Sequence, residues 1–191
     1  MSYLVGTADC SIDDKRRFSL HPKFRAGFGI KTSEESGHYY PAVLIPWKKG
    51  ALSLIPLKRW QEMTADIELL DYTIEEIDNA KLICLSGAEN VNSDPDTRFT
   101  MPKEHCEWIR IEPGKKGRLV LAGTGEMVRV FNADEWPDVR KTGMNPKAQS
   151  AEVQFYEKAL ETLLGASRAA RKDALEWERR RALSQNGEPL P

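Results

Sequence analysis

The chain contains one short pattern twice, about eighty residues apart. The first copy occupies residues 13–20 and leads into Pro22, and the second occupies residues 94–101 and leads into Pro102. Each copy reads Asp-x-x-x-Arg-Phe, followed by a hydroxyl residue and an apolar residue. Duplicated units tend to pack about a twofold axis, which brings their equivalent loops to one surface. The repeat therefore constrains the fold more than any other feature.

The similarity continues downstream of both motifs. Each copy has two apolar segments that predict a hairpin, the first in residues 39–55 with Gly50 in its turn, the second turning at residues 123–125. Short predicted helices at residues 57–60 and 133–136 then carry Trp60 and Trp136 in equivalent places. Because the Trp recurs in both copies, we interpret it as a core residue.

The segments around the first motif also have readable patterns. Residues 6–12 predict a strand that leads into the motif, and residues 18–20 predict a short strand that enters the core. Pro22 favours the start of a short helix, with Phe24 and Phe28 on its inner face.

The two copies are joined by a segment without a Pro-, Gly- or Ser-rich tract. Residues 73–76 have the spacing of a capping box and predict a helix. Its apolar residues are expected to face the core: Ile74, Ile77, Leu82 and Ile83. The predicted organisation is a first repeat, a bridging helix, a second repeat, and a C-terminal helix and tail, at residues 1–66, 67–90, 91–142 and 143–191.

A long helix is predicted from Asn145 and Pro146 to about residue 183. Its stripe residues recur at spacings of three and four: Tyr156, Leu160, Leu163, Ser167, Ala170, Ala174 and Trp177. Two interpretations stay open, a helix that packs on its own barrel and a helix that makes an intermolecular contact. The basic residues of this helix alternate with acidic ones at pairing distance, which favours a solvated face.

The composition limits the classes of function. No stretch has the roughly 18–20 apolar residues of a membrane span, and the first residues do not have a signal-peptide pattern. We therefore expect a cytoplasmic protein with no membrane partner. The three cysteines, Cys10, Cys84 and Cys106, have no paired spacing and predict free thiols. The formal net charge is -1, so a nucleic-acid surface requires local segregation of charge.

Catalytic and metal-binding patterns are weak. The neighbours His105 and Cys106 diverge on either a helix or a strand, so we predict a core Cys beside a surface His, with no catalytic dyad. The His residues are scattered without metal-ligand spacing, and neither common phosphate-binding Gly pattern occurs. We expect no enzyme, no catalytic residue, no metal and no cofactor.

Basic charge is concentrated in the first motif, at Lys15, Arg16 and Arg17, with Lys23 and Arg25 beyond it. Arg can form bidentate contacts to guanine or clamp a phosphate, and Lys neutralises phosphates. These residues are therefore candidates for DNA contact. For Lys15 and Arg16 the alternative is an ordinary solvated turn.

The second motif is less basic, because Pro95, Asp96 and Thr97 reduce its positive charge to Arg98. Asp94 is placed to pair with Arg98, as Asp13 is with Arg17, and each pair would fix its turn. We favour this structural role for the Asp and Arg of both motifs, and it does not exclude DNA contact.

Together, the motifs resemble the MraZ family, bacterial transcriptional regulators of the AbrB-like swapped-hairpin superfamily. The resemblance extends from residue 3 to about residue 139. Family members most often carry Asp-x-Lys-Gly-Arg, matched here by Asp13, Lys15 and Arg17, and the family element Leu-Leu-x-x-Pro-x-x-x-Trp resembles residues 54–60. Arg16 stands where the family usually has Gly, so the turn must tolerate a side chain.

The resemblance implies an α+β fold, a duplicated swapped-hairpin (AbrB-like) barrel with pseudo-twofold symmetry, here followed by the long C-terminal helix. It also implies a nucleoid-associated regulator that binds repeated elements of double-stranded DNA, upstream of a division and cell-wall gene cluster, as a ring-like homo-oligomer. The implied DNA-binding residues are Lys15, Arg16, Arg17, Lys23, Arg25 and Arg98, with Asp13 and Asp94 as structural residues.

Two other functions remain as alternatives. One is a ring-forming scaffold with reduced or lost DNA binding that engages a protein partner through the C-terminal helix. The other is an antitoxin-like partner, although such proteins usually carry one copy of the motif.

Overall fold

Helices and strands of both halves of the chain are defined in the computed structural model, which describes residues 3–29, 40–47, 50–65, 78, 81–82 and 85–142. The elements of the first half are β1 (Leu4–Ile12), β2 (Arg17–Ser19), α1 (Pro22–Arg25), η1 (Ala26–Phe28), β3 (Pro41–Trp47), β4 (Ala51–Pro56) and α2 (Leu57–Ala65). Those of the second half are β5 (Glu89–Asn92), β6 (Arg98–Thr100), α4 (Lys103–Trp108), β7 (Gly117–Gly125), β8 (Val128–Asn132) and α5 (Trp136–Thr142).

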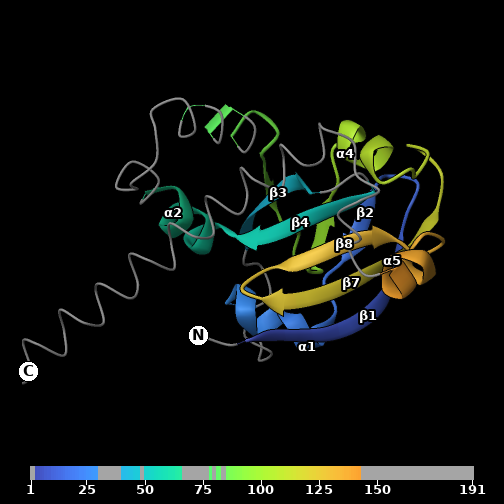
Figure 1. Ribbon diagram of the computed structural model, residues 1–191, viewed down its shortest axis with the longest axis horizontal. Helices are drawn as coiled ribbons and strands as arrows, with labels where there is room; N and C mark the ends of the chain where they lie inside the picture. Colours follow the sequence, from blue (N-terminus) through green and yellow to red (C-terminus); the bar gives the residue numbers. More distant parts are fainter. Residues whose placement is uncertain are drawn as a thin grey trace, which may run out of the picture.

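The strands form one antiparallel sheet in the order β5-β3-β4-β8-β7-β1-β2-β6. An isolated bridge between Ser93 and Phe99 brings the two ends of this order together. The sheet is therefore a nearly closed eight-stranded barrel, with short helices around it, and the fold is α+β (Figure 1).

The two halves interleave along the sheet. The strand before the first motif, β1, pairs with β7 of the other half, from Leu4 opposite Gly125 to Ile12 opposite Gly117. The strand before the second motif, β5, pairs in the same way with β3. Because each half supplies a hairpin on which the other half's strand pairs, neither half can complete this sheet alone.

Equivalent strands also pair with each other. In the β2–β6 pair, Phe18 lies opposite Phe99, and in the β4–β8 pair Ser53 lies opposite Arg129. Each strand is thus related to its counterpart by an approximate twofold axis through these two positions. The duplicated sequence accordingly produces a pseudo-symmetric arrangement of strands.

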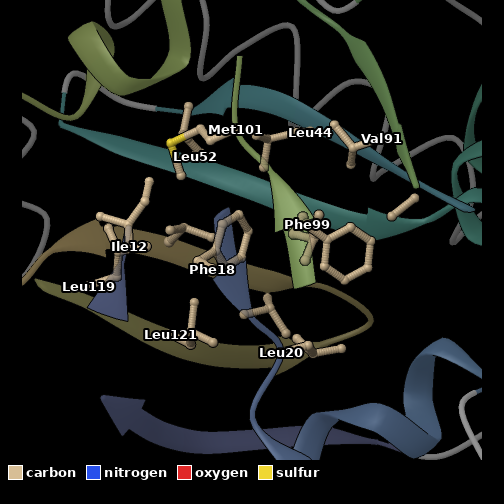
Figure 2. Close-up of a cluster of buried hydrophobic side chains, with 14 of the residues drawn as sticks. Ile12, Phe18, Leu20, Leu44, Leu52, Val91, Phe99, Met101, Leu119 and Leu121 are labelled. Carbon is tan, nitrogen blue, oxygen red and sulfur yellow. The ribbon is translucent and has the colours of Figure 1, made fainter. Parts of the chain in front are cut away.

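The barrel interior is filled by apolar side chains from every strand and from α1, η1 and α4. Phe18 and Phe99 lie near its centre with ring centroids 6.0 Å apart, between Leu44 and Leu52 on one side and Leu121 on the other (Figure 2). Burial of one such aromatic side chain contributes about 2–3 kcal/mol. The predicted inward strand at residues 18–20 is confirmed.

A second apolar cluster lies on the outer face of the barrel. It includes Trp47 and Ile55 of the first hairpin, Trp60 and Met63 of α2, and Phe131 of β8. Trp136 packs against the same cluster, with its ring centroid 4.9 Å from that of Phe131. The predicted core packing is confirmed for Trp60, which is buried, whereas Trp136 is half-buried at the edge of the cluster.

Several other predictions of local structure agree with the structure. Strand β1 covers residues 6–12, α1 begins at Pro22, and Phe24 and Phe28 are buried. Gly50 has a φ of 88° in the first hairpin turn, a left-handed conformation that Gly adopts without steric cost.

Three predictions of local structure need correction. The second hairpin turns later than predicted, because β7 continues through Gly125. Thr124 is still part of the strand pairing, and its N–H donates to the Met127 carbonyl. Helix α5 begins at Trp136 itself, not before it. Leu82 was expected in the core but is 66 % exposed.

Other expected elements lie outside the described residues. They are Ile74, Ile77 and Ile83 of the predicted bridging helix, and the predicted C-terminal helix at residues 145–183. Among the described residues, none of the helices has the length and apolar character of a membrane span.

Candidate nucleic-acid interface

The first motif forms a tight turn between β1 and β2, held by Asp13. Its carboxylate accepts hydrogen bonds from the Arg17 backbone N–H at 2.8 Å and from Arg17 Nε at 2.8 Å. The Asp13 N–H donates to the Arg17 carbonyl, and the Arg16 N–H donates to the Asp13 carbonyl. The Asp and Arg of the motif therefore close the turn from both sides and fix its backbone.

The second motif repeats this geometry. The Asp94 carboxylate accepts from the Arg98 backbone N–H at 2.9 Å and from Arg98 Nε at 2.7 Å. Arg98 also pairs with Asp96, 2.8 Å away. The Arg98 guanidinium thus has two carboxylate neighbours, whereas Arg17 has Asp13.

The hydrogen bonds of each turn favour the ionised Asp. The backbone N–H and side chain of Arg17 hold the pKa of Asp13 below its usual value. Burial acts against ionisation of Asp94, but the backbone N–H and guanidinium of Arg98 outweigh it and lower that pKa as well. Both turns are therefore fixed by carboxylates that stay charged at neutral pH.

Arg16 occupies a left-handed backbone conformation, with a φ of 64°. This is the position where the family usually has Gly, and L-residues other than Asn and Asp adopt this region at a cost of roughly 1–2 kcal/mol. The turn tolerates the side chain, and as a result carries an additional cation. Lys15 beside it is exposed.

Lys15 and Arg16 differ from Arg17 in their partners. No carboxylate in the described part of the chain forms an ion pair with either of them, whereas Arg17 is engaged by Asp13. Their charges are therefore available to an external anion.

Lys23 and Arg25, the predicted DNA-binding residues beyond the first motif, donate hydrogen bonds to backbone carbonyls. Lys23 Nζ donates to the carbonyl of Thr7 in the middle of β1, and Arg25 Nε donates to the Leu20 carbonyl at 3.1 Å. Thr7 lies about 17 Å along β1 from Ile12, where the turn begins. Lys23 is thus directed away from Lys15 and Arg16 and does not form one cluster with them.

The two motif turns lie at opposite ends of the short β2–β6 pair. The Met101 N–H donates to the Arg16 carbonyl at 2.8 Å, and the Leu20 N–H donates to the Thr97 carbonyl at 3.1 Å. Three-residue strands separate the turns by about 10 Å. The first turn presents Lys15 and Arg16, while the second presents Asp96 and the paired Arg98, so the charge of the two turns is unequal.

Thr97 is the left-handed residue of the second turn, with a φ of 60°. A β-branched residue is strongly disfavoured there. Its hydroxyl is also buried and finds no hydrogen-bond partner among the described residues. The second turn therefore contains a strained and unsatisfied residue that is not required for its Asp94–Arg98 pair.

We predict that Thr97→Gly raises the free energy of unfolding by about 1 kcal/mol, because it removes the left-handed strain and the unpaired hydroxyl. Chemical denaturation measures this gain. Thr97→Ala keeps a Cβ at the positive φ and removes the hydroxyl together with the γ-methyl group, so its gain should be smaller. A Thr97→Gly protein less stable than the unaltered chain would contradict this account of the turn.

His105 is a correction to the sequence prediction, because it is 5 % exposed on α4 instead of lying at the surface. The predicted burial of Cys106 is confirmed. Burial lowers the pKa of His105, and backbone groups at Gly87 and Leu44 and the carboxylates of Glu89 and Glu104 only partly oppose this. The imidazole is therefore neutral in the folded protein at neutral pH.

We predict that stability decreases as the pH falls from about 7 to 5.5. The unfolded chain protonates His105 near its ordinary pKa of 6.5, whereas the folded chain resists protonation until lower pH, so the unfolded state gains protons first. Denaturation curves at several pH values measure this decline. It should be much smaller in His105→Leu and persist in His21→Gln, which changes an exposed His; an unchanged decline in His105→Leu would exclude His105 as its source.

Two described cysteines are free. Burial raises the pKa of Cys10 to about 12 and that of Cys106 to about 11, so neither thiol is activated as a nucleophile. Cys84 lies outside the described residues. The described residues also contain no group of three His, Cys, Asp or Glu side chains that could hold a metal ion.

The sequence analysis did not identify two Arg residues that are buried in the structure. Arg59 of α2 pairs with Glu126 at 2.6 Å, and so ties the helix to the turn of the second hairpin. Arg129 lies over the Trp47 ring, 3.3 Å from its centroid, and donates to the Ser53 hydroxyl. The burial of Arg129 could have been suspected from its position between two Val residues of an apolar strand.

No protein-family model matches the chain. Among curated proteins it is similar to Transcriptional regulator MraZ of Syntrophomonas wolfei, with 24 % identity over 84 % of this chain and 96 % of the relative. The protein of that name from Pelotomaculum thermopropionicum is 24 % identical over 84 % of this chain and 98 % of the relative. The protein of that name from Herpetosiphon aurantiacus is 24 % identical over 71 % of this chain and 85 % of the relative. Together with the duplicated Asp-x-x-x-Arg turn, these relatives support the membership of this chain in the MraZ family.

Proposed function

We propose that the chain is a sequence-specific, DNA-binding transcriptional regulator of the MraZ type, built on a swapped-hairpin (AbrB-like) barrel. The relatives named as transcriptional regulators support this proposal at the level of the family. The structural observation that carries it is the first turn, whose backbone is fixed by Asp13 and Arg17 while Lys15 and Arg16 have no ion-pair partner among the described residues.

In this proposal Arg16 reads DNA and Lys15 anchors it. A guanidinium can form two hydrogen bonds to the O6 and N7 of guanine in the major groove, and an ammonium group neutralises a backbone phosphate. A fixed turn helps because little conformational freedom is lost on binding. Asp13 remains paired with Arg17 throughout, so Arg17 mainly positions its two neighbours.

The other predicted cations have a secondary role in the proposal. Lys23 and Arg25 already donate to backbone carbonyls, and Arg98 is engaged by Asp94 and Asp96. Each would have to exchange these partners for phosphates. The acidic second turn would lie away from the DNA backbone.

One turn with two free cations would bind DNA weakly. We propose that the protein acts as a ring-like homo-oligomer in the nucleoid, so that several first turns engage repeated promoter elements upstream of a division and cell-wall gene cluster. Linked binding sites raise the overall affinity without new contacts at any one site. Native mass spectrometry of the full chain measures the oligomeric state.

The direct test uses the full-length chain and fluorescence anisotropy. One labelled duplex carries the DNA upstream of the chain's own gene, and the other carries the same base composition in shuffled order. The proposal predicts tighter binding to the upstream duplex and weaker binding to both at higher salt. A folded protein that binds neither duplex would refute the regulator and favour the ring-forming scaffold.

A further inference from the structure

We infer that the second half of the chain completes the DNA-binding surface of the first turn, through the basic segment at residues 115–118. Lys116 is its central residue and would bind a backbone phosphate beside those bound by Lys15 and Arg16. This inference rests on the proposed function, because it names further contacts of the same surface.

The antiparallel pairing of β1 and β7 brings this segment to the turn. Gly117 lies opposite Ile12, and Arg118 lies opposite Ser11. A Cβ added at Gly117 would lie 3.2 Å from Ile12 Cγ2, which shows how closely the two strands approach. Asp13 starts the turn directly after Ile12, and Lys116 directly precedes Gly117. Adjacent strands are about 5 Å apart, so Lys116 emerges next to the first turn.

The other side of the turn is also formed by the second half. The Arg16 carbonyl accepts from the Met101 N–H, and α4 begins two residues later at Lys103. Lys103 is exposed and lies 3.7 Å from Glu107, a distance that makes only a weak ion pair. The first turn is thus flanked on both sides by lysines that are remote from it in sequence.

Lys116 resembles Lys15 in its environment. It is exposed, and within the described ranges no carboxylate forms an ion pair with it. Its neighbours Lys115 and Arg118 pair with Glu112 at 2.6 Å and Asp134 at 3.0 Å. All four of these side chains are exposed, and such pairs contribute about 0–1 kcal/mol, so a phosphate can replace the carboxylate.

The turn also carries the exposed carboxylate of Asp14, which would repel a phosphate. Lys15 and Arg16 alone therefore leave a small excess of positive charge, and Lys116 increases it. The second turn has Asp94 and Asp96 in the same motif, with one Arg paired to both. The combined surface would therefore favour DNA binding at the first turn over the second.

The test compares Lys116→Ala with Lys58→Ala in the full-length chain. Lys58 is also an exposed lysine without an ion pair in the described structure, but it lines a pocket with Tyr3 and Gly125. That pocket is at the end of β1 remote from Ile12, about 26 Å away. The two variants therefore remove the same charge from opposite ends of one strand.

The inference predicts that Lys116→Ala weakens binding to the upstream and shuffled duplexes alike, by roughly fivefold to tenfold at about 0.1 M salt, while Lys58→Ala changes it by less than about twofold. The slope of log affinity against log salt should also become shallower by about one in Lys116→Ala. Equal affinities for Lys116→Ala and the unaltered chain, or equal losses in both variants, would overturn the inference. Failure of the unaltered chain to bind either duplex would instead overturn the proposed function on which it rests.

Discussion

Phe99→Ala is expected to lower the free energy of unfolding by about 3–5 kcal/mol. Phe99 is fully buried, and its ring lies 6.0 Å from that of Phe18 and 6.3 Å from that of Phe28. The substitution would leave a cavity at the point where β2 and β6 join the two halves. Because this pairing links both copies of the repeat, the protein has no separate half that can stay folded around the cavity.

Urea denaturation of Phe99→Ala, Phe18→Ala and Val5→Ala measures this effect. Phe18 is opposite Phe99 in the strand pair and equally buried, so its substitution should have a similar cost. Val5 is 60 % exposed on β1, and its substitution should change stability by less than about 0.5 kcal/mol. A loss below about 1 kcal/mol for Phe99→Ala would contradict a core shared by the two halves.

The second large effect concerns DNA. The double variant Lys15→Ala, Arg16→Gly is expected to bind the upstream duplex about fiftyfold more weakly at roughly 0.1 M salt, because it removes one cation that would release counterions from a phosphate and one that would hydrogen-bond a base. Gly is chosen at position 16 because it adopts the φ of 64° more easily than Arg. Arg17 is left in place, since its removal would also release Asp13 and the turn.

Local structure was largely predictable from the sequence. Alternation of apolar residues predicted β1 and β2, Pro22 predicted the start of α1, and Gly50 predicted the first hairpin turn. Arg16, where the family usually has Gly, required a turn that tolerates a side chain, and the turn holds Arg16 in a left-handed conformation with a φ of 64°. Such signals depend on a few neighbouring residues, which is why a single sequence contains them.

The partners of each strand could not be read in this way. That β1 pairs with β7, and β5 with β3, depends on register between segments more than forty residues apart in the chain. A hydrophobic pattern says which face of a strand is buried but does not identify its neighbour. The approach of Lys116 to the first turn follows from this pairing, so the sequence analysis omitted it from the candidate site.

Burial of polar residues was also difficult to predict. His105 and Arg129 belong to types that are usually exposed or only partly buried, and their burial results from neighbours that are distant in sequence. Lys23 looked like a continuation of the basic motif, but its side chain reaches the Thr7 carbonyl because α1 packs beside β1. In these cases tertiary contacts decide where the charge is placed.

The central claim is that the first turn, and not the second, binds DNA. The most direct measurement is fluorescence anisotropy of the upstream duplex with the double variant Lys15→Ala, Arg16→Gly. The single variant Thr97→Gly is its matched control. Both variants place Gly at the left-handed position of a motif turn, but only the first removes positive charge. The account predicts about a fiftyfold loss of affinity for the first variant and unchanged affinity for the second. Unchanged affinity in Lys15→Ala, Arg16→Gly, with the unaltered chain binding the duplex, would contradict it.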